Sequence, residues 1–172
     1  MTTSQEARTA PVRRVQESEW AALRDARLAA LADAPYAFSS TAAREQQFAE
    51  QTWRDRTRTG AVFAAWAGPE IVGLATARLD PDEGWCLVGM WVHPDWRASG
   101  AADQLVGSVC GHARTAGAES ISLWVTEVNA RARAFYARLG FAPTGGRQLV
   151  RPDEPDHWEV HLARDLRQPR SG

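Results

Sequence analysis

The chain has 172 residues, of which 44% are apolar and 24% are charged, and its formal net charge is −1. A chain of this length usually forms one hydrophobic core, so we predict a single domain over residues 1–172. No apolar run approaches the roughly 20 residues that cross a bilayer, and the near-zero charge provides no field to hold a polyanion. The composition therefore excludes a membrane span and argues against a nucleic-acid partner.

Lysine is absent from the chain, because all 20 basic residues are arginines. A Walker phosphate loop and an imine-forming enzyme both need a lysine, so the sequence excludes these two classes. The two cysteines, Cys86 and Cys110, lack C-x-x-C spacing, and the first residues lack the pattern of a secretion signal. We therefore expect reduced thiols and a cytoplasmic protein.

The first half of the chain predicts a strand, two helices and a hairpin. A short strand begins at Val12, and an N-cap at Ser18 opens a helix that ends at Pro35. A polar helix is expected over residues 41–59. Alternating runs at 61–67 and 71–79, joined by a Gly-Pro-Glu turn, predict a β-hairpin. The apolar face of the first helix consists of Trp20, Leu23, Leu28 and Leu31.

The second half contains the most regular pattern. A strand at residues 85–92 precedes a helix, and a strand at 121–125 follows it, which predicts a parallel crossover. Another helix begins at an Asn129 cap and ends at Gly140, where a left-handed residue belongs. Segments 141–151 and 157–166 predict a closing hairpin. The apolar face of the helix in the crossover consists of Ala102, Leu105, Val106, Val109, Cys110 and Ala113.

Small residues fill the loop between the strand at 85–92 and the helix after it. Free backbone N–H groups at a helix start bind anions, and small side chains let a pyrophosphate approach the main chain. Arg97 can add a charge-assisted contact. The same composition also suits an ordinary loop. The segment reads Arg97-Ala98-Ser99-Gly100-Ala101-Ala102.

Two segments resemble the two motifs of the GNAT superfamily of N-acetyltransferases. The first is this loop, preceded by a hydrophobic-Val-x-Pro strand end, and the order of elements also resembles the family from Val12 to Leu166. The resemblance implies an α+β GNAT fold, with a mixed, mostly antiparallel sheet of six to seven strands, a splayed parallel pair and about four flanking helices. It also implies acetyl-CoA as cosubstrate. The second motif comprises Asn129, Ala132, Phe135, Tyr136, Leu139, Gly140 and Phe141.

The resemblance implies roles at the coenzyme site. The pantetheine arm would lie like an added strand along the edge formed by Met90, Trp91 and Val92, and the Met90 amide would polarise the thioester oxygen. Asn129 would bond the pantetheine, whereas its local role is to cap the helix. The backbone N–H groups that would hold the pyrophosphate belong to Arg97, Ala98, Ser99, Gly100, Ala101 and Ala102.

Tyr136 resembles the family's proton donor to the departing thiolate, although its position also suits a core aromatic. A phenol of pKa about 10 gives its proton to a thiol of pKa about 8.5 at a cost of roughly 2 kcal/mol. We therefore expect Tyr136 to stabilise the leaving sulfur by hydrogen bonding.

An alkylamine is almost entirely protonated at pH 7, so a proton acceptor is expected at the site. Family members often place a glutamate on the strand where this chain has Cys86. Glu127 is the nearest replacement, although an acid there also suits the helix dipole. Glu83 and His157 are weaker candidates, and a water chain or an acceptor of low pKa would also suffice.

Four residues are expected to line the acceptor pocket: Phe38, Trp53, Trp85 and Cys86. Simple alternation places Trp85 and Trp91 on the same face of their strand. The sequence His157-Trp158-Glu159-Val160-His161 lacks the spacing of a zinc motif, so we expect no metal.

The leading hypothesis is acetyl transfer from acetyl-CoA to a primary amine by direct attack in a ternary complex. We expect a small-molecule amine, such as an antibiotic or a toxic metabolite, because no acidic cluster is present to attract basic peptides. Acetylation of a protein or peptide is the alternative, and a non-catalytic acyl-CoA sensor is the alternative of another class. The protein is expected to be a monomer or a homodimer.

Overall fold

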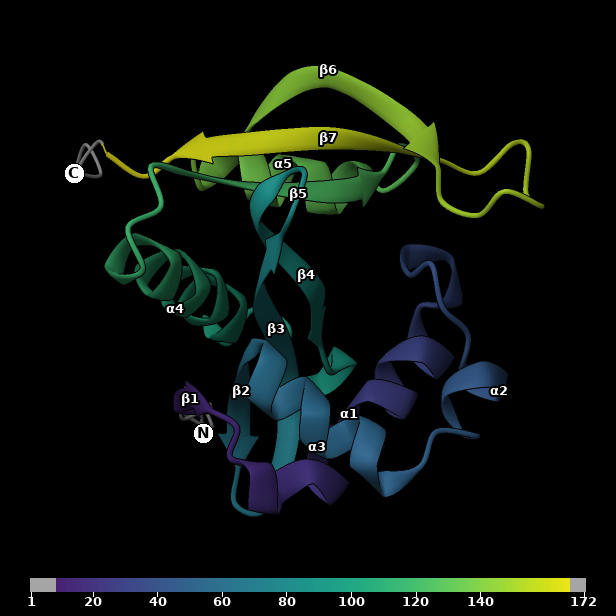
Figure 1. Cartoon of the computed structure of the whole chain (residues 1–172), viewed down its shortest axis with the longest axis vertical. Helices are drawn as coiled ribbons and strands as arrows, with labels where there is room; N and C mark the ends of the chain where they lie inside the picture. Colours follow the sequence, from purple (N-terminus) through teal and green to yellow (C-terminus); the bar gives the residue numbers. More distant parts are fainter. Residues whose placement is uncertain (1–8, 168–172) are drawn as a thin grey trace, which may run out of the picture.

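The computed structural model describes residues 9–167, and its centre is a seven-stranded sheet in the order β1-β2-β3-β4-β5-β7-β6 (Figure 1). Only β4 and β5 run parallel, and all other neighbours are antiparallel. This mixed sheet confirms the predicted α+β fold class. The strands are β1 Val12–Arg14, β2 Ala61–Ala67, β3 Glu70–Asp80, β4 Gly84–Val92, β5 Ser120–Thr126, β6 Ala142–Leu149 and β7 Trp158–Asp165.

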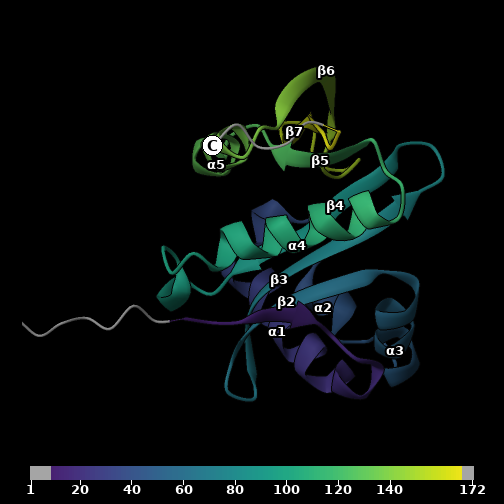
Figure 2. The same ribbon diagram turned by 90° about the vertical axis from the view of Figure 1, so that its left-hand side faces the viewer.

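Helices cover both faces of the sheet. The helix α4 lies along one side of β3 and β4, and α1, α2 and α3 lie on the other (Figure 2). One apolar core therefore joins the sheet to α4 and α5, and a second joins it to the first three helices. The helices are α1 Trp20–Asp33, α2 Ala42–Glu45, α3 Glu50–Thr59, α4 Ala101–Thr115 and α5 Ala130–Arg138, with 3-10 turns at Glu17–Glu19, Pro35–Ala37 and Pro94–Trp96.

The start of α1 differs from the prediction. Ser18 lies inside the 3-10 turn, and the cap is a reciprocal pair in which the Gln16 amide donates to the Glu19 carboxylate at 2.8 Å. Arg13 also donates to this carboxylate. The prediction of a Ser18 N-cap is therefore wrong, because the Glu19 carboxylate accepts the hydrogen bond of the free Gln16 amide.

The single helix expected over residues 41–59 consists of two helices in the structure. Thr41 caps the first by accepting from the Arg44 amide, and a break at residues 46–49 separates α2 from α3. Glu45, at the end of α2, is buried between two arginines. The break leaves the Glu45 carboxylate and the buried Trp53 ring on the inner side of their separate helices.

A β-bulge divides β4 into two parts. Gly89 and Met90 stand opposite the single residue Ala75 of β3, and Gly89 has a φ of +65°, which glycine adopts without strain. The extra residue inverts the alternation of side chains along the strand. Trp85 therefore packs in the core beside α4, whereas Trp91 packs in the core beside α1, and the prediction that they share one face is wrong.

The parallel pair β4 and β5 is splayed. The two strands pair only at Cys86 and Ser122, after which β5 turns away to pair with β7 along its whole length. Figure 1 shows β5 running across the direction of β4. The splay confirms the expected geometry and leaves the far part of β4 without a strand on that side.

The end of α5 is a Schellman motif. Gly140, with a φ of +88°, donates to the Ala137 carbonyl, and the Phe141 amide donates to the Tyr136 carbonyl, both at 3.0 Å. The rings of Phe141 and Tyr136 make the accompanying apolar contact, with centroids 5.6 Å apart. The predicted left-handed cap is confirmed, and it fixes the position of the Tyr136 ring.

Candidate functional site

A cavity of about 670 Å³ lies where β4 and β5 separate. Its size is typical of a small-ligand pocket. Met90, Cys86 and the bulge residue Gly89 line it from β4, while Asn129 and Tyr136 line it from the opposite side. The structure therefore brings five residues from two separate segments of the chain to one space.

Backbone amides at the start of α4 form a ready anion site. The amides of Arg97, Ser99 and Ala101 are used within the loop, donating to Pro94, Trp96 and Ser99 oxygens. The alternate amides, at Ala98, Gly100 and Ala102, donate to no acceptor within residues 9–167. Ala98 and Gly100 both have positive φ, an arrangement that forms an anion-binding nest.

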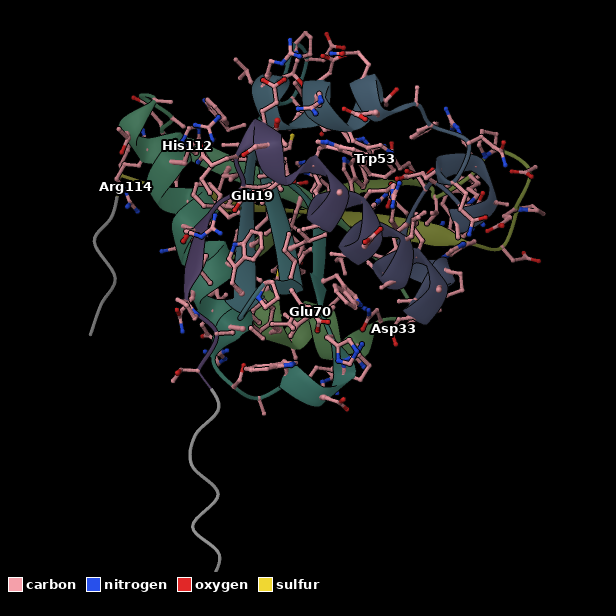
Figure 3. All side chains as sticks on the ribbon, turned by 90° about the horizontal axis from the view of Figure 1, so that it is seen from below. Glu19, Asp33, Trp53, Glu70, His112 and Arg114 are labelled. Carbon is pink, nitrogen blue, oxygen red and sulfur yellow. The ribbon has the colours of Figure 1, made fainter. Side chains whose placement is uncertain are left out.

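The Arg97 side chain lies elsewhere than expected. Its Nε donates to the Val92 carbonyl at 3.1 Å, and its Nη2 bonds the Asp33 carboxylate, which also accepts from Trp91 Nε1 at 2.9 Å. Figure 3 labels Asp33 at the C-terminal end of α1. This geometry corrects the expectation of a free phosphate contact: the Arg97 guanidinium ties the loop to α1 and β4.

The outer edge of β4 presents two amides to the splay. His93 donates to Val72 of β3, and because strand amides alternate, the Val92 amide points away from β3. The Met90 amide, two residues earlier, points the same way. Trp91 points its amide toward β3, and its side chain is buried in the core beside α1. Met90 and Val92 are thus the edge donors, and Trp91 is a packing residue.

Asn129 and Tyr136 present polar atoms from α5. Asn129 Oδ1 caps the helix by accepting from the Ala132 amide at 3.0 Å, so its amide nitrogen is left to face the cavity. The Tyr136 ring is buried, and its hydroxyl has no hydrogen-bond partner within residues 9–167. Burial raises the pKa of Tyr136 well above its ordinary value of 10.0. The phenol is therefore a neutral hydrogen-bond donor.

Two carboxylates, Glu83 and Glu159, line the end of the cavity beside Cys86. Glu83 accepts from Trp124 Nε1 at 3.1 Å, and Glu159 accepts from Gln148 Nε2 at 2.8 Å. Burial raises the pKa of Glu159, which favours its action as a base near neutral pH. Burial also raises the pKa of Cys86, so its thiol stays protonated.

Glu127 lies outside the cavity lining, and Arg147 binds it through two hydrogen bonds of 3.1 and 2.9 Å. The Arg147 hydrogen bonds lower the pKa of Glu127 and make it a weaker base. His157 likewise faces away, with its Nδ1 2.7 Å from a Glu154 oxygen. The geometry corrects the expectation that Glu127 serves the cavity.

The four predicted acceptor residues separate into two pairs. Phe38 and Cys86 line the cavity. Trp53 is fully buried among the first helices, and Trp85 packs edge-on against His112 of α4 with centroids 5.5 Å apart. Trp53 and Trp85 are therefore core residues, which corrects the prediction for both.

Residues that the sequence interpretation left unassigned complete the lining. Glu159 reaches the cavity because β7 pairs with β5, an arrangement that local patterns do not reveal. Thr126 at the end of β5 also lines it, and its buried hydroxyl has no partner within the described residues. In the sequence, the strand-like alternation of residues 157–161 indicated that Glu159 lies on a strand, but not which strand pairs with it.

Two features are absent from residues 9–167. No group of three or more His, Cys, Asp or Glu side chains is arranged to hold a metal ion. No helix in this part of the chain is both long enough and apolar enough to cross a membrane.

Solved structures with this fold include several acetyltransferases. An aminoglycoside 6′-acetyltransferase type Ii has a TM-score of 0.71 at 16% identity, covering 93% of this chain and 99% of that chain. The ribosomal-protein-S18-alanine N-acetyltransferase from Escherichia coli has a TM-score of 0.67 at 16% identity, with coverages of 94% and 97%. The PaiA N-acetyltransferase from Thermoplasma acidophilum, solved with coenzyme A, has a TM-score of 0.65 at 10% identity, with coverages of 92% and 99%.

The sequence itself has no significant match among curated proteins. Residues 18–141, more than half of the chain, match the acetyltransferase (GNAT) family. This match agrees with the splayed strands and with the free amides at the start of α4. The chain therefore belongs to the GNAT family of acetyltransferases.

Proposed function

We propose that the protein transfers an acetyl group from acetyl-CoA to the primary amine of a small molecule by direct attack in a ternary complex. The observation that carries this proposal is the convergence of the Met90 amide, the Asn129 side chain and the Tyr136 hydroxyl on one cavity. Within residues 9–167, the Asn129 amide nitrogen and the Tyr136 hydroxyl donate to no protein acceptor, and the Met90 amide points away from β3. They are arranged around the gap where a thioester-bearing arm would lie.

The residues present fit the pyrophosphate and the pantetheine arm of coenzyme A. The free amides of Ala98, Gly100 and Ala102 would hold the pyrophosphate at the N-terminus of α4. The outward amides of Met90 and Val92 would bind the carbonyls of the pantetheine arm, and Asn129 would bind it from the other side. When bound, acetyl-CoA supplies an activated thioester.

Two groups act on the charge that develops during transfer. The Met90 amide beside the bulge donates to the carbonyl oxygen as it becomes negative. The Tyr136 hydroxyl donates to the departing sulfur. Because burial raises the pKa of Tyr136, full proton transfer to the thiolate would cost more than the roughly 2 kcal/mol expected for an ordinary phenol. Tyr136 therefore stabilises the sulfur through a hydrogen bond.

The acceptor must lose a proton before or during its attack. Neutralising an alkylammonium of pKa about 10.4 at pH 7 costs roughly 4–5 kcal/mol. Glu159 takes the role of proton acceptor through a chain of water molecules, because it is partly buried, faces the cavity and has a raised pKa. Glu83, which shares this end of the cavity, increases the negative charge around the leaving proton.

A small molecule is favoured as the acceptor because the site is a cavity of about 670 Å³ with polar groups on its walls. The similar structures include both an enzyme named for aminoglycosides and one named for a protein alanine. A peptide acceptor would instead need a groove that continues across the surface. The protein-acetylating alternative is separated from the proposal by the test below.

The test combines calorimetry with a thiol-release assay. We expect acetyl-CoA to bind, and we expect free coenzyme A to appear only when an amine is added from a panel of small molecules. Binding without thiol release for any amine or peptide would indicate the non-catalytic sensor, and release with peptides alone would indicate a protein acceptor. Absence of binding would refute the proposed function.

A further inference from the structure

Two partly exposed arginines and one buried glutamate form a cluster on the wall of the cavity. Arg27 of α1 binds Glu45 through Nη2 at 2.9 Å and through Nε, and Arg56 of α3 binds its other oxygen through Nη1 at 2.8 Å. Both arginines line the cavity, whereas Glu45 lies behind them. The Glu45 side chain is only 1% exposed.

The cluster carries a net charge of about +1, because two guanidinium groups face one carboxylate. Burial opposes ionisation of Glu45, but the hydrogen bonds from Arg27 and Arg56 outweigh it and hold the pKa of this carboxyl at about 2. The carboxylate is therefore charged at neutral pH and compensates only one of the two arginines. The uncompensated positive charge belongs to side chains that are 16% and 35% exposed and line the cavity, so an anion bound there would interact favourably with it.

Arg27 directs its unused nitrogen into the cavity. Its Nη1 has no hydrogen-bond partner within residues 9–167, although the side chain is only 16% exposed. This nitrogen lies 3.9 Å from where a Cβ on Gly89 would be, so it faces the bulge of β4. The guanidinium also stacks over Phe38 at 4.7 Å, which fixes its plane.

The opposite end of the cavity is negative. Glu83 Oε2 lies 3.7 Å from Cys86 Sγ, and Glu159 lines the same end. Cys86 precedes Gly89 by three residues, or roughly 10 Å of strand. Arg78, the remaining cationic residue of the lining, lies 3.7 Å from Asp80, which offsets its charge. The cavity is thus positive beside the bulge and negative beside Cys86.

We propose that the acceptor is an amino acid or a close analogue, whose carboxylate binds Arg27 and Arg56 while its amine lies beside the bulge at Gly89 and Met90. This inference rests on the proposed acetyl transfer. A planar guanidinium with a free nitrogen matches the two oxygens of a carboxylate. The carboxylate would supply the missing negative charge of the cluster and hold the neighbouring amine next to the Met90 amide.

The test measures kcat/KM of the intact protein for the common amino acids and for their carboxamides, with acetyl-CoA saturating. We expect the best amino acid to be acetylated at least about tenfold more efficiently than its carboxamide, the effect of a charged hydrogen bond. Replacing the carboxylate also lowers the pKa of the amine and increases its neutral fraction. The measured preference therefore understates the contribution of the arginines.

Arg27→Gln should remove most of this preference, measured as the ratio of kcat/KM for the amino acid to kcat/KM for its carboxamide. The matched control is Arg24→Gln, because Arg24 lies on the same helix, is absent from the cavity lining, has a side chain that is 41% exposed and donates to its neighbour Asp25. Calorimetry with acetyl-CoA verifies that each variant is folded. If Arg27→Gln fails to fold, the comparison of the amino acid with its carboxamide on the unaltered protein still tests the inference.

Equal rates for amino acids and carboxamides, or a preference that survives in folded Arg27→Gln, would overturn the inference and leave the acetyltransferase activity standing. Thiol release with simple amines but with no amino acid would do the same. No thiol release with any amine would overturn the proposed function together with this inference.

Discussion

Replacing Tyr136 by phenylalanine tests the role of a single hydroxyl. The ring is held on two sides, by Phe135 at 5.2 Å and by Phe141 at 5.6 Å, and a phenylalanine keeps both contacts. The hydroxyl itself bonds no group within residues 9–167, so its removal breaks no hydrogen bond of the described fold. We expect the free energy of unfolding to change by less than about 0.5 kcal/mol.

The expected loss of turnover follows from the hydrogen bond to the developing thiolate. A hydrogen bond to a charged group contributes about 1.5–3 kcal/mol, which corresponds to a roughly 10- to 150-fold lower kcat. The affinity for acetyl-CoA should stay nearly the same, because the bond strengthens only as the sulfur becomes negative. The raised pKa of Tyr136 also means that no tyrosine ionisation should appear in the kcat profile below pH 10.

The assay follows release of coenzyme A at saturating acetyl-CoA, with calorimetry of acetyl-CoA binding in parallel. Tyr36→Phe is the matched control, because Tyr36 is the other tyrosine of the chain and is 51% exposed. An unchanged kcat in Tyr136→Phe would refute the hydrogen-bond role. An equal loss in the Tyr36→Phe control would show that the effect is not specific to the site.

Three further predictions concern the base, the coenzyme loop and the cluster around Glu45. Glu159→Gln should lower kcat about 100-fold or more and abolish the rise of activity as pH increases through the raised pKa of Glu159; a retained rise would exclude it as the base. Gly100→Ala, at a φ of +83°, should destabilise the fold by about 1–2 kcal/mol and weaken acetyl-CoA binding in calorimetry, whereas Gly107→Ala, with open space around it in α4, should do neither. Glu45 has a folded pKa of about 2, below its ordinary 4.5, so its contribution to stability is present above pH 4.5 and is lost as the pH falls toward 2. Denaturant titrations should show this loss, of up to about 3 kcal/mol, in the unaltered protein and not in Glu45→Gln.

The sequence predicted the elements whose signal is local. The apolar face of α4 and the left-handed end of α5 at Gly140 depend on residues within a few positions of each other, so periodicity and cap residues were sufficient. The predicted Ser18 cap of α1 was wrong because Arg13 and Gln16 both bind Glu19. No local pattern at Ser18 reveals these contacts.

The site was predicted less completely because its walls come from distant segments. The coenzyme loop is contiguous, so its location was evident, but the ion pair of Arg97 with Asp33 depends on how α1 ends. Glu127 is adjacent to the site in sequence and yet pairs with Arg147 of β6. Glu159 reaches the cavity only through the pairing of β7 with β5, which composition and spacing do not encode.

The bulge at Gly89 and Met90 lets β4 carry one more residue than the stretch of β3 that it pairs with. Because both bulge residues stand opposite Ala75, removing one of them would leave Trp91 opposite Leu74, with its indole still toward α1. Removing a residue beyond the bulge would instead bring Val92 opposite Leu74 and exchange the two sides of every later position. Natural or designed length changes should therefore be tolerated in the flanking turns and at the bulge, and not in the regular part of the strand.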